Sequence, residues 1–98
     1  MEFKEFFRIV DNFFSYKTGN RYILHEDTKT IECTLYECFV IHLSIGDRYG
    51  VFGASIMLDG VPRSLTRILG GHISLNSDKD SIEENLRLID EFDCLINF

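Results

Sequence analysis

The sequence predicts an α+β domain in which an antiparallel sheet of about four to five strands packs against an N-terminal and a C-terminal amphipathic helix. Apolar residues recur at helical spacing near both ends of the chain and alternate with polar residues over its middle. With 98 residues, one proline and a hydrophobic share of 45%, the chain suits a single domain spanning residues 1–98.

The first predicted helix spans Phe3 to Tyr16 and is recognised by a stripe of phenylalanines. Acidic and basic residues are mixed on its other face, whereas a helix that binds membranes has a basic polar face. We therefore expect the stripe to pack in the core, and the helix to end at Thr18-Gly19-Asn20. The stripe consists of Phe3, Phe6, Phe7, Val10, Phe13 and Phe14.

From Ile31 to Ile45 apolar and polar residues alternate, as in a strand with one buried face. Glu37 interrupts the pattern because it falls on the apolar side. The stretch is therefore either two strands with a break near Tyr36-Glu37 or a strand with a bulge there. The apolar side consists of Ile31, Cys33, Leu35, Phe39, Ile41, Leu43 and Ile45.

A further strand is predicted beyond the turn residues Gly46-Asp47-Arg48, antiparallel to the preceding one. Gly50 and Gly53 within it indicate a bulge or a close approach of another part of the backbone. Asp59-Gly60 marks the next reversal of the chain. Its apolar face consists of Phe52, Ala54, Ile56 and Leu58.

Pro62 to Leu69 fits two structures, an edge strand or a short helix with proline in its first turn and Gly70-Gly71 beyond its end. The next four residues, His72 to Leu75, are predicted to form a short strand. They precede the polar loop from Asn76 to Asp80.

The second amphipathic helix is predicted to begin at Ser81, because Ser81 and Glu84 have the spacing of a capping box. Asp93 would fall on its apolar stripe, so we expect the helix to end near Phe92 and Cys94 to Phe98 to form a tail or a last short strand. The stripe consists of Ile82, Leu86, Ile89 and Phe92.

The charge balance favours a basic partner. Sixteen acidic and ten basic side chains give a net charge of −6, which repels nucleic acids and anionic membranes. Cys33, Cys38 and Cys94 are too few and too scattered for a disulfide framework, so free thiols in a reducing cytosol are expected. The charged start lacks the features of a signal peptide, and no apolar run approaches the ~20 residues of a membrane span. We expect a soluble, cytoplasmic protein.

Catalytic and metal-binding patterns are weak. Cys38 and His42 could pair as nucleophile and base, but no carboxylate or amide is clearly placed to orient His42. The histidines, His25, His42 and His72, lack the paired spacing of a zinc site, and Cys33 with Cys38 lacks a second cysteine pair. We expect no enzymatic activity, no metal and no cofactor.

Acidic residues are concentrated between Asp78 and Asp93, where seven carboxylates accompany only Lys79 and Arg87. One interpretation is a solvated helix face, with the first acidic residues also favoured by the positive helix N-terminus. The other is a docking surface for a cationic partner, such as the groove in which a nuclease holds phosphates. The candidate contacts are Asp78, Asp80, Glu83, Glu84, Asp90 and Glu91.

The segment Leu69 to Asp90, LGGHISLNSDKDSIEENLRLID, resembles the C-terminal segment of immunity proteins found beside bacterial polymorphic toxins, including contact-dependent growth inhibition systems. The resemblance implies no catalytic residues. It implies tight binding of one cognate toxin domain inside the cell. The similar positions are Ser74 to Asp78, Ser81-Ile82, Asn85-Leu86 and Ile89-Asp90.

The leading hypothesis is therefore an immunity protein that blocks the active site of a basic toxin domain, often a nuclease, without contacting nucleic acid or membrane itself. Tyr36 and Tyr49, with Tyr16, are candidate aromatic anchors at this interface. The alternative is a small non-catalytic adaptor or regulatory domain that binds another protein. A small hydrolase using Cys38 and His42 is the third hypothesis.

Overall fold

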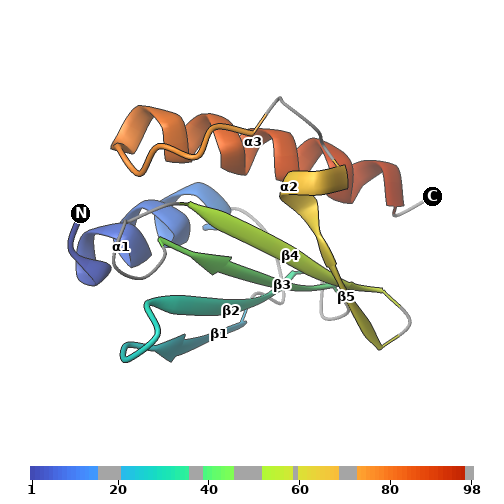
Figure 1. Cartoon of the computed structure of the whole chain (residues 1–98), viewed down its shortest axis with the longest axis horizontal. Helices are drawn as coiled ribbons and strands as arrows, with labels where there is room; N and C mark the ends of the chain where they lie inside the picture. Colours follow the sequence, from blue (N-terminus) through green and yellow to red (C-terminus); the bar gives the residue numbers. More distant parts are fainter. Residues whose placement is uncertain (16–20, 36–38, 46–51, 59, 69–72, 97–98) are drawn as a thin grey trace.

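A five-stranded antiparallel sheet forms one layer of the molecule, and helices cover one of its faces (Figure 1). The structure, a computed structural model, describes residues 1–15, 21–35, 39–45, 52–58, 60–68 and 73–96. The strands pair in chain order, so every connection is a reversal between neighbours. They are β1 (Arg21–His25), β2 (Thr30–Leu35), β3 (Phe39–Ser44), β4 (Gly53–Leu58) and β5 (Val61–Ser64). The predicted α+β class is confirmed.

Two long helices, α1 (Phe3–Phe14) and α3 (Lys79–Ile96), lie on the same face of the sheet and contact each other. The phenylalanine stripe of α1 packs in the core as expected, with two differences. Phe7 and Phe13 are only partly buried, whereas Ile9 is buried. A short helix, α2 (Leu65–Ile68), follows β5 directly. The expected helix end at residues 18–20 lies outside the described residues.

The core occupies the space between the two long helices and the sheet. Alternate residues of the three central strands point into it, which is why the sequence alternates there. Phe6 of α1 meets Phe52 edge to face, with ring centroids 6.4 Å apart. Each large apolar side chain buried in this layer contributes about 1.5–3 kcal/mol. The strand residues involved include Ile31, Cys33, Ile41, Leu43, Ala54 and Ile56.

The long alternating stretch is two strands rather than one. Leu35 at the end of β2 pairs with Phe39 at the start of β3, which makes the two strands a hairpin. The position of Glu37 between them lies outside the described residues. The predicted antiparallel pairing of β3 with β4 is confirmed.

Gly53 and Gly60 have identifiable reasons to be glycine. A Cβ atom at Gly53 would lie 2.9 Å from the hydroxyl oxygen of Ser44, its cross-strand partner, so the close neighbour here is a side chain rather than the predicted backbone. Gly60, between β4 and β5, has a φ of 78°, a conformation that side chains disfavour. Gly50 lies outside the described residues.

The ambiguous segment from Pro62 forms both of the structures considered. It begins inside the edge strand β5, where Pro62 pairs with Met57 and the missing amide proton is tolerated at the sheet edge. The chain then turns into α2 at Leu65, whose side chain is fully buried.

The strand predicted at residues 72–75 is wrong for its described part, residues 73–75. The Asn85 side chain of α3 accepts a hydrogen bond from the Ser74 amide at 2.9 Å and donates one to the Ser74 carbonyl at 2.8 Å. The Leu75 carbonyl accepts a hydrogen bond from the Phe52 amide. Because these partners satisfy the backbone, the segment needs no strand ladder.

Both predicted ends of α3 are also wrong. The helix begins at Lys79, because Asp78 rather than Ser81 is the cap: its carboxylate accepts a hydrogen bond from the Ser81 amide at 3.1 Å. The helix continues through Asp93 to Ile96, and no glycine or proline interrupts this stretch. Within the described part of the chain, no helix has the length and apolar character that crossing a membrane requires.

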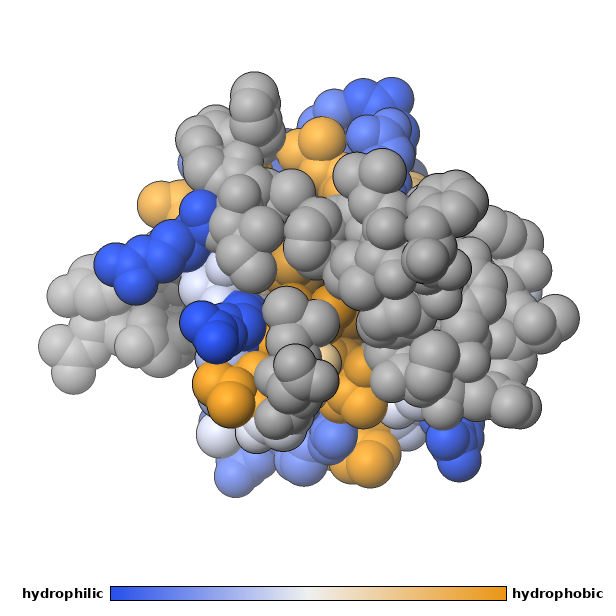
Figure 2. Space-filling model, turned by 90° about the vertical axis from the view of Figure 1, so that its right-hand side faces the viewer, coloured by the Kyte–Doolittle hydropathy of each residue, from blue (hydrophilic) through white to orange (hydrophobic). Residues whose placement is uncertain are grey.

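Figure 2 views the molecule from the end at which α2, the β4–β5 turn and the C-terminus lie. Hydrophobic residues are visible between hydrophilic ones on this side. The candidate sites lie elsewhere, on the outer side of α3 and on the sheet face that no helix covers.

Candidate functional site

The outer side of α3 carries the acidic surface, which we define as Asp78, Asp80, Glu83, Glu84, Asp90 and Glu91. α3 adopts this orientation because Ile82, Leu86 and Ile89 are buried against the core on its other side. Five of the six carboxylates are exposed, as expected. Asp90 differs, since it is half-buried at the border between the apolar and solvent sides.

Two ion pairs neutralise part of this surface. Lys79 Nζ lies 3.8 Å from a carboxylate oxygen of Glu83, and the Arg87 guanidinium contacts Glu84. Such exposed pairs contribute little to stability, about 0–1 kcal/mol each. The six carboxylates of the acidic surface and these two cations leave four negative charges. The acidic surface therefore keeps an attractive field for a cation.

Asp78 is charged under all ordinary conditions. Hydrogen bonds from the side chain and then the backbone amide of Ser81 lower the pKa of the Asp78 carboxyl below its ordinary value of 3.8. The negative charge also lies at the positive end of the α3 dipole. Asp78 thus combines a structural role as helix cap with a place in the acidic surface.

Phe13 forms the apolar part of the same site. It is half-buried at the junction of α1 and α3, and two shallow hollows meet at its ring. One has a volume of about 270 Å³, and the other, of about 210 Å³, lies toward Ile9. The larger hollow is lined by Phe13, Asp80, Glu83, Glu84 and Arg87.

An aromatic ring beside carboxylates is chemically suited to a lysine or arginine side chain. The cation is attracted to the face of the ring and can donate hydrogen bonds to the carboxylates. The sequence pattern assigned Phe13 to the core, because its spacing matches the stripe. Its position at the edge of that stripe, after the polar residues Asp11 and Asn12, is the only signal that could have indicated exposure.

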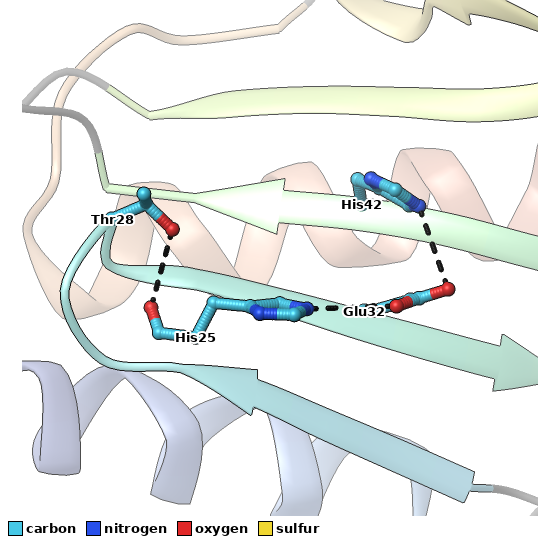
Figure 3. Close-up of polar contacts among 4 residues, drawn as sticks. All are labelled: His25, Thr28, Glu32 and His42. Atoms are coloured by element: carbon cyan, nitrogen blue, oxygen red, sulfur yellow. Dashed lines mark hydrogen bonds and ion pairs between the residues drawn. The ribbon is translucent and has the colours of Figure 1, made fainter.

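The uncovered face of the sheet carries a second polar cluster (Figure 3). Glu32 on β2 lies between two histidines of the neighbouring strands, with its carboxylate 3.5 Å from His25 Nε2 and 3.9 Å from His42 Nε2. The Thr28 hydroxyl donates to the His25 carbonyl at 3.4 Å. The expectation that no carboxylate is placed beside His42 is therefore wrong, because strand register makes Glu32 its direct neighbour.

This cluster adjoins a shallow hollow of about 410 Å³, and four of the residues that line it carry hydroxyl groups. Its lining includes Thr30, His42, Ser44, Ser55, Arg63 and Ser64. Among the described side chains, no group of three or more histidines, cysteines or acids is arranged to hold a metal ion.

Several candidate residues lie outside the described part of the chain. These are the proposed anchors Tyr16, Tyr36 and Tyr49, together with Cys38 and His72. The pairing of Cys38 with His42 therefore stays a hypothesis. Cys33 is buried in the core and does not contribute to either surface.

Known proteins offer no match to this chain, whether compared as protein-family models, as curated sequences or as solved structures.

Proposed function

We propose that the protein is a non-catalytic immunity protein that binds a cognate bacterial toxin domain, a basic nuclease, and blocks its active site. The observation that carries the proposal is the hollow in which the half-buried ring of Phe13 is bordered by Asp80, Glu83 and Glu84. A nuclease holds phosphates with lysine and arginine side chains. The hollow offers such side chains an aromatic face and negative charge in the place of phosphate.

The rest of the acidic surface supports association. Carboxylates along α3 steer a basic partner toward the hollow and raise the rate of encounter at low ionic strength. Exposed carboxylates contribute more to this rate than to the final affinity. The salt dependence of association is therefore the property that best tests the proposed surface.

The segment that resembles immunity proteins also supports the proposal. Ser74 and Asn85 join the loop before α3 to the helix itself, and Asp78 caps the helix. These three residues hold in place the first turns of α3, which carry Asp80, Glu83 and Glu84. The residues of the resemblance thus build the framework of the acidic surface.

The test begins with the protein domain encoded directly beside this gene. We expect this domain to inhibit bacterial growth when expressed alone, and co-expression of the present protein to restore growth. The purified pair should form a one-to-one complex. A neighbouring domain without toxicity, together with capture of only a housekeeping protein, would contradict the proposal and favour a regulatory adaptor.

The docking surface is tested by matched removal of charge. Glu84→Gln with Glu91→Gln should slow association by about tenfold at low salt and flatten its salt dependence. The control is Glu2→Gln with Glu5→Gln, which also removes two negative charges from exposed positions. These positions lie far from the hollow, at least ~12 Å from Phe13 along α1. This control should change the rate much less. Equal effects of both double variants would exclude α3 as the docking surface.

A further inference from the structure

The two edges of the sheet are protected to different degrees. β5 is the edge strand on one side, and it carries Pro62 and Arg63, two features that hinder pairing with another strand. β1 is the other edge strand, and among the described residues it is hydrogen-bonded to β2 alone. It contains no proline, and two of its apolar side chains are exposed, Ile23 at 55% and Leu24 at 46%.

We propose that β1 pairs with β1 of a second copy of this chain, antiparallel and around a two-fold axis perpendicular to the sheet. Such pairing adds main-chain hydrogen bonds along the edge of β1 and continues the sheet across the two copies. The proposal concerns self-association and does not depend on the proposed immunity function.

The fold restricts the register of this pairing. Residues directly opposite each other must lie on the same face of a sheet, so odd positions of β1 face odd positions and even face even. The one register that pairs all five residues is centred on Ile23. It places Ile23 opposite Ile23 on the uncovered face, and Leu24 opposite Tyr22 on the helix face. Arg21 then lies opposite His25.

Both apolar contacts involve side chains of β1 that are exposed or half-buried. Tyr22 is half-buried and packs edge to face against Phe7 of α1, with ring centroids 5.4 Å apart. In the pair, Leu24 of one copy covers this aromatic pair of the other, and the two Ile23 side chains cover each other. Cross-strand apolar pairs of this kind are the main stabilising contacts of a sheet.

Charge complementarity favours the antiparallel orientation. Arg21 begins β1, and the acidic residues Glu26 and Asp27 follow its end in the turn to β2. In an antiparallel pair, Arg21 of each copy comes alongside this acidic turn of the other copy. The contact occurs twice by symmetry.

Sedimentation equilibrium over micromolar to millimolar concentrations tests the proposal on the full chain. We expect a monomer–dimer equilibrium for the wild type and a monomer for Ile23→Lys. The control is Val61→Lys, which changes an equally exposed residue (48%) on the opposite edge strand. This variant should dimerise like the wild type. A monomeric wild type at every concentration, or equal behaviour of the two variants, would overturn the proposal.

Cysteine cross-linking gives an independent readout of the register. The two Ile23 positions would lie about 4.5–5.5 Å apart between Cα atoms, within the range of a disulfide. Under mild oxidation, Ile23→Cys should form more disulfide-linked dimer than the wild type, whose own three cysteines set the baseline. Val61→Cys should form no more than the wild type. Cross-linking of Val61→Cys to the same extent, or none for Ile23→Cys, would exclude the proposed pairing.

Discussion

Asn85 offers the sharpest test of how this fold is held together. Among the described residues of the core, Asn85 is the polar one, and it has no exposed surface. Its side-chain amide donates a hydrogen bond to the Ser74 carbonyl and accepts one from the Ser74 amide. Replacing it with leucine keeps a side chain of similar size and a good helix former. The substitution removes the side-chain amide to which the Ser74 amide and carbonyl are both hydrogen-bonded.

The expected loss of stability follows from these two backbone groups. A buried polar group without a partner costs about 1–3 kcal/mol. Ser74 is half-buried, so water can replace part of the interaction, and we expect Asn85→Leu to lower the free energy of unfolding by about 2–4 kcal/mol. This is a large share of the roughly 5–15 kcal/mol that stabilises a small domain.

Urea unfolding followed by circular dichroism measures the effect, with the denaturant slope checked for constancy. Asn12→Leu is the control, since Asn12 is exposed on α1 and should tolerate the change within about 0.5 kcal/mol. Hydrogen exchange should show faster exchange of the Ser74 amide in Asn85→Leu. A variant as stable as the wild type, with an unchanged Ser74 amide, would refute the assigned role of Asn85.

Three further predictions concern single residues. Gly53→Ala should cost no more than about 1 kcal/mol, because the Ser44 hydroxyl that it approaches can rotate away, and adding Ser44→Ala should restore most of this loss in urea unfolding. The lowered pKa of Asp78 stabilises the fold above its ordinary value of 3.8, so the stability difference between wild type and Asp78→Asn should shrink as pH falls through the lowered pKa. Phe13→Leu should weaken binding of a basic partner about two- to fivefold.

Each of these predictions has a contrary outcome. A double variant no more stable than Gly53→Ala alone would place the strain away from Ser44. A stability difference for Asp78→Asn that is constant from neutral to acidic pH would show that the Asp78 charge does not support the cap. Unchanged binding by Phe13→Leu, with the fold intact, would remove the aromatic ring from the docking surface.

The sheet was predictable because burial of one face imposes a period of two on the sequence. The alternation from Ile31 to Ile45 reports this face directly, and turn residues separate the later strands. The break between β2 and β3 was detectable because Glu37 violates the alternation. These signals are local, so a single sequence contains them.

The predictions from sequence were wrong where a backbone group is hydrogen-bonded to a residue far along the chain, or where several neighbouring residues could each cap the same helix. Ile73 to Leu75 has the apolar–polar alternation of a strand, but its partner is a side chain eleven residues away on α3. Asp78, Asp80 and Ser81 are all good helix caps, and local sequence does not rank them. The cluster of Glu32 with His25 and His42 requires the strand register, which no local pattern supplies.

The two proposed interfaces use separate parts of the molecule, and this separation makes them distinguishable. The acidic surface lies on α3, whereas β1 lies at the sheet edge away from α3 (Figure 1). A two-fold axis perpendicular to the sheet keeps the helices of both copies on the same side, so a dimer would present two acidic surfaces in the same direction. Ile23→Lys should therefore abolish the dimer and leave one-to-one binding of a basic partner intact. Loss of both properties by a folded Ile23→Lys variant would mean that β1 also contributes to partner binding and that the two interfaces are not separate.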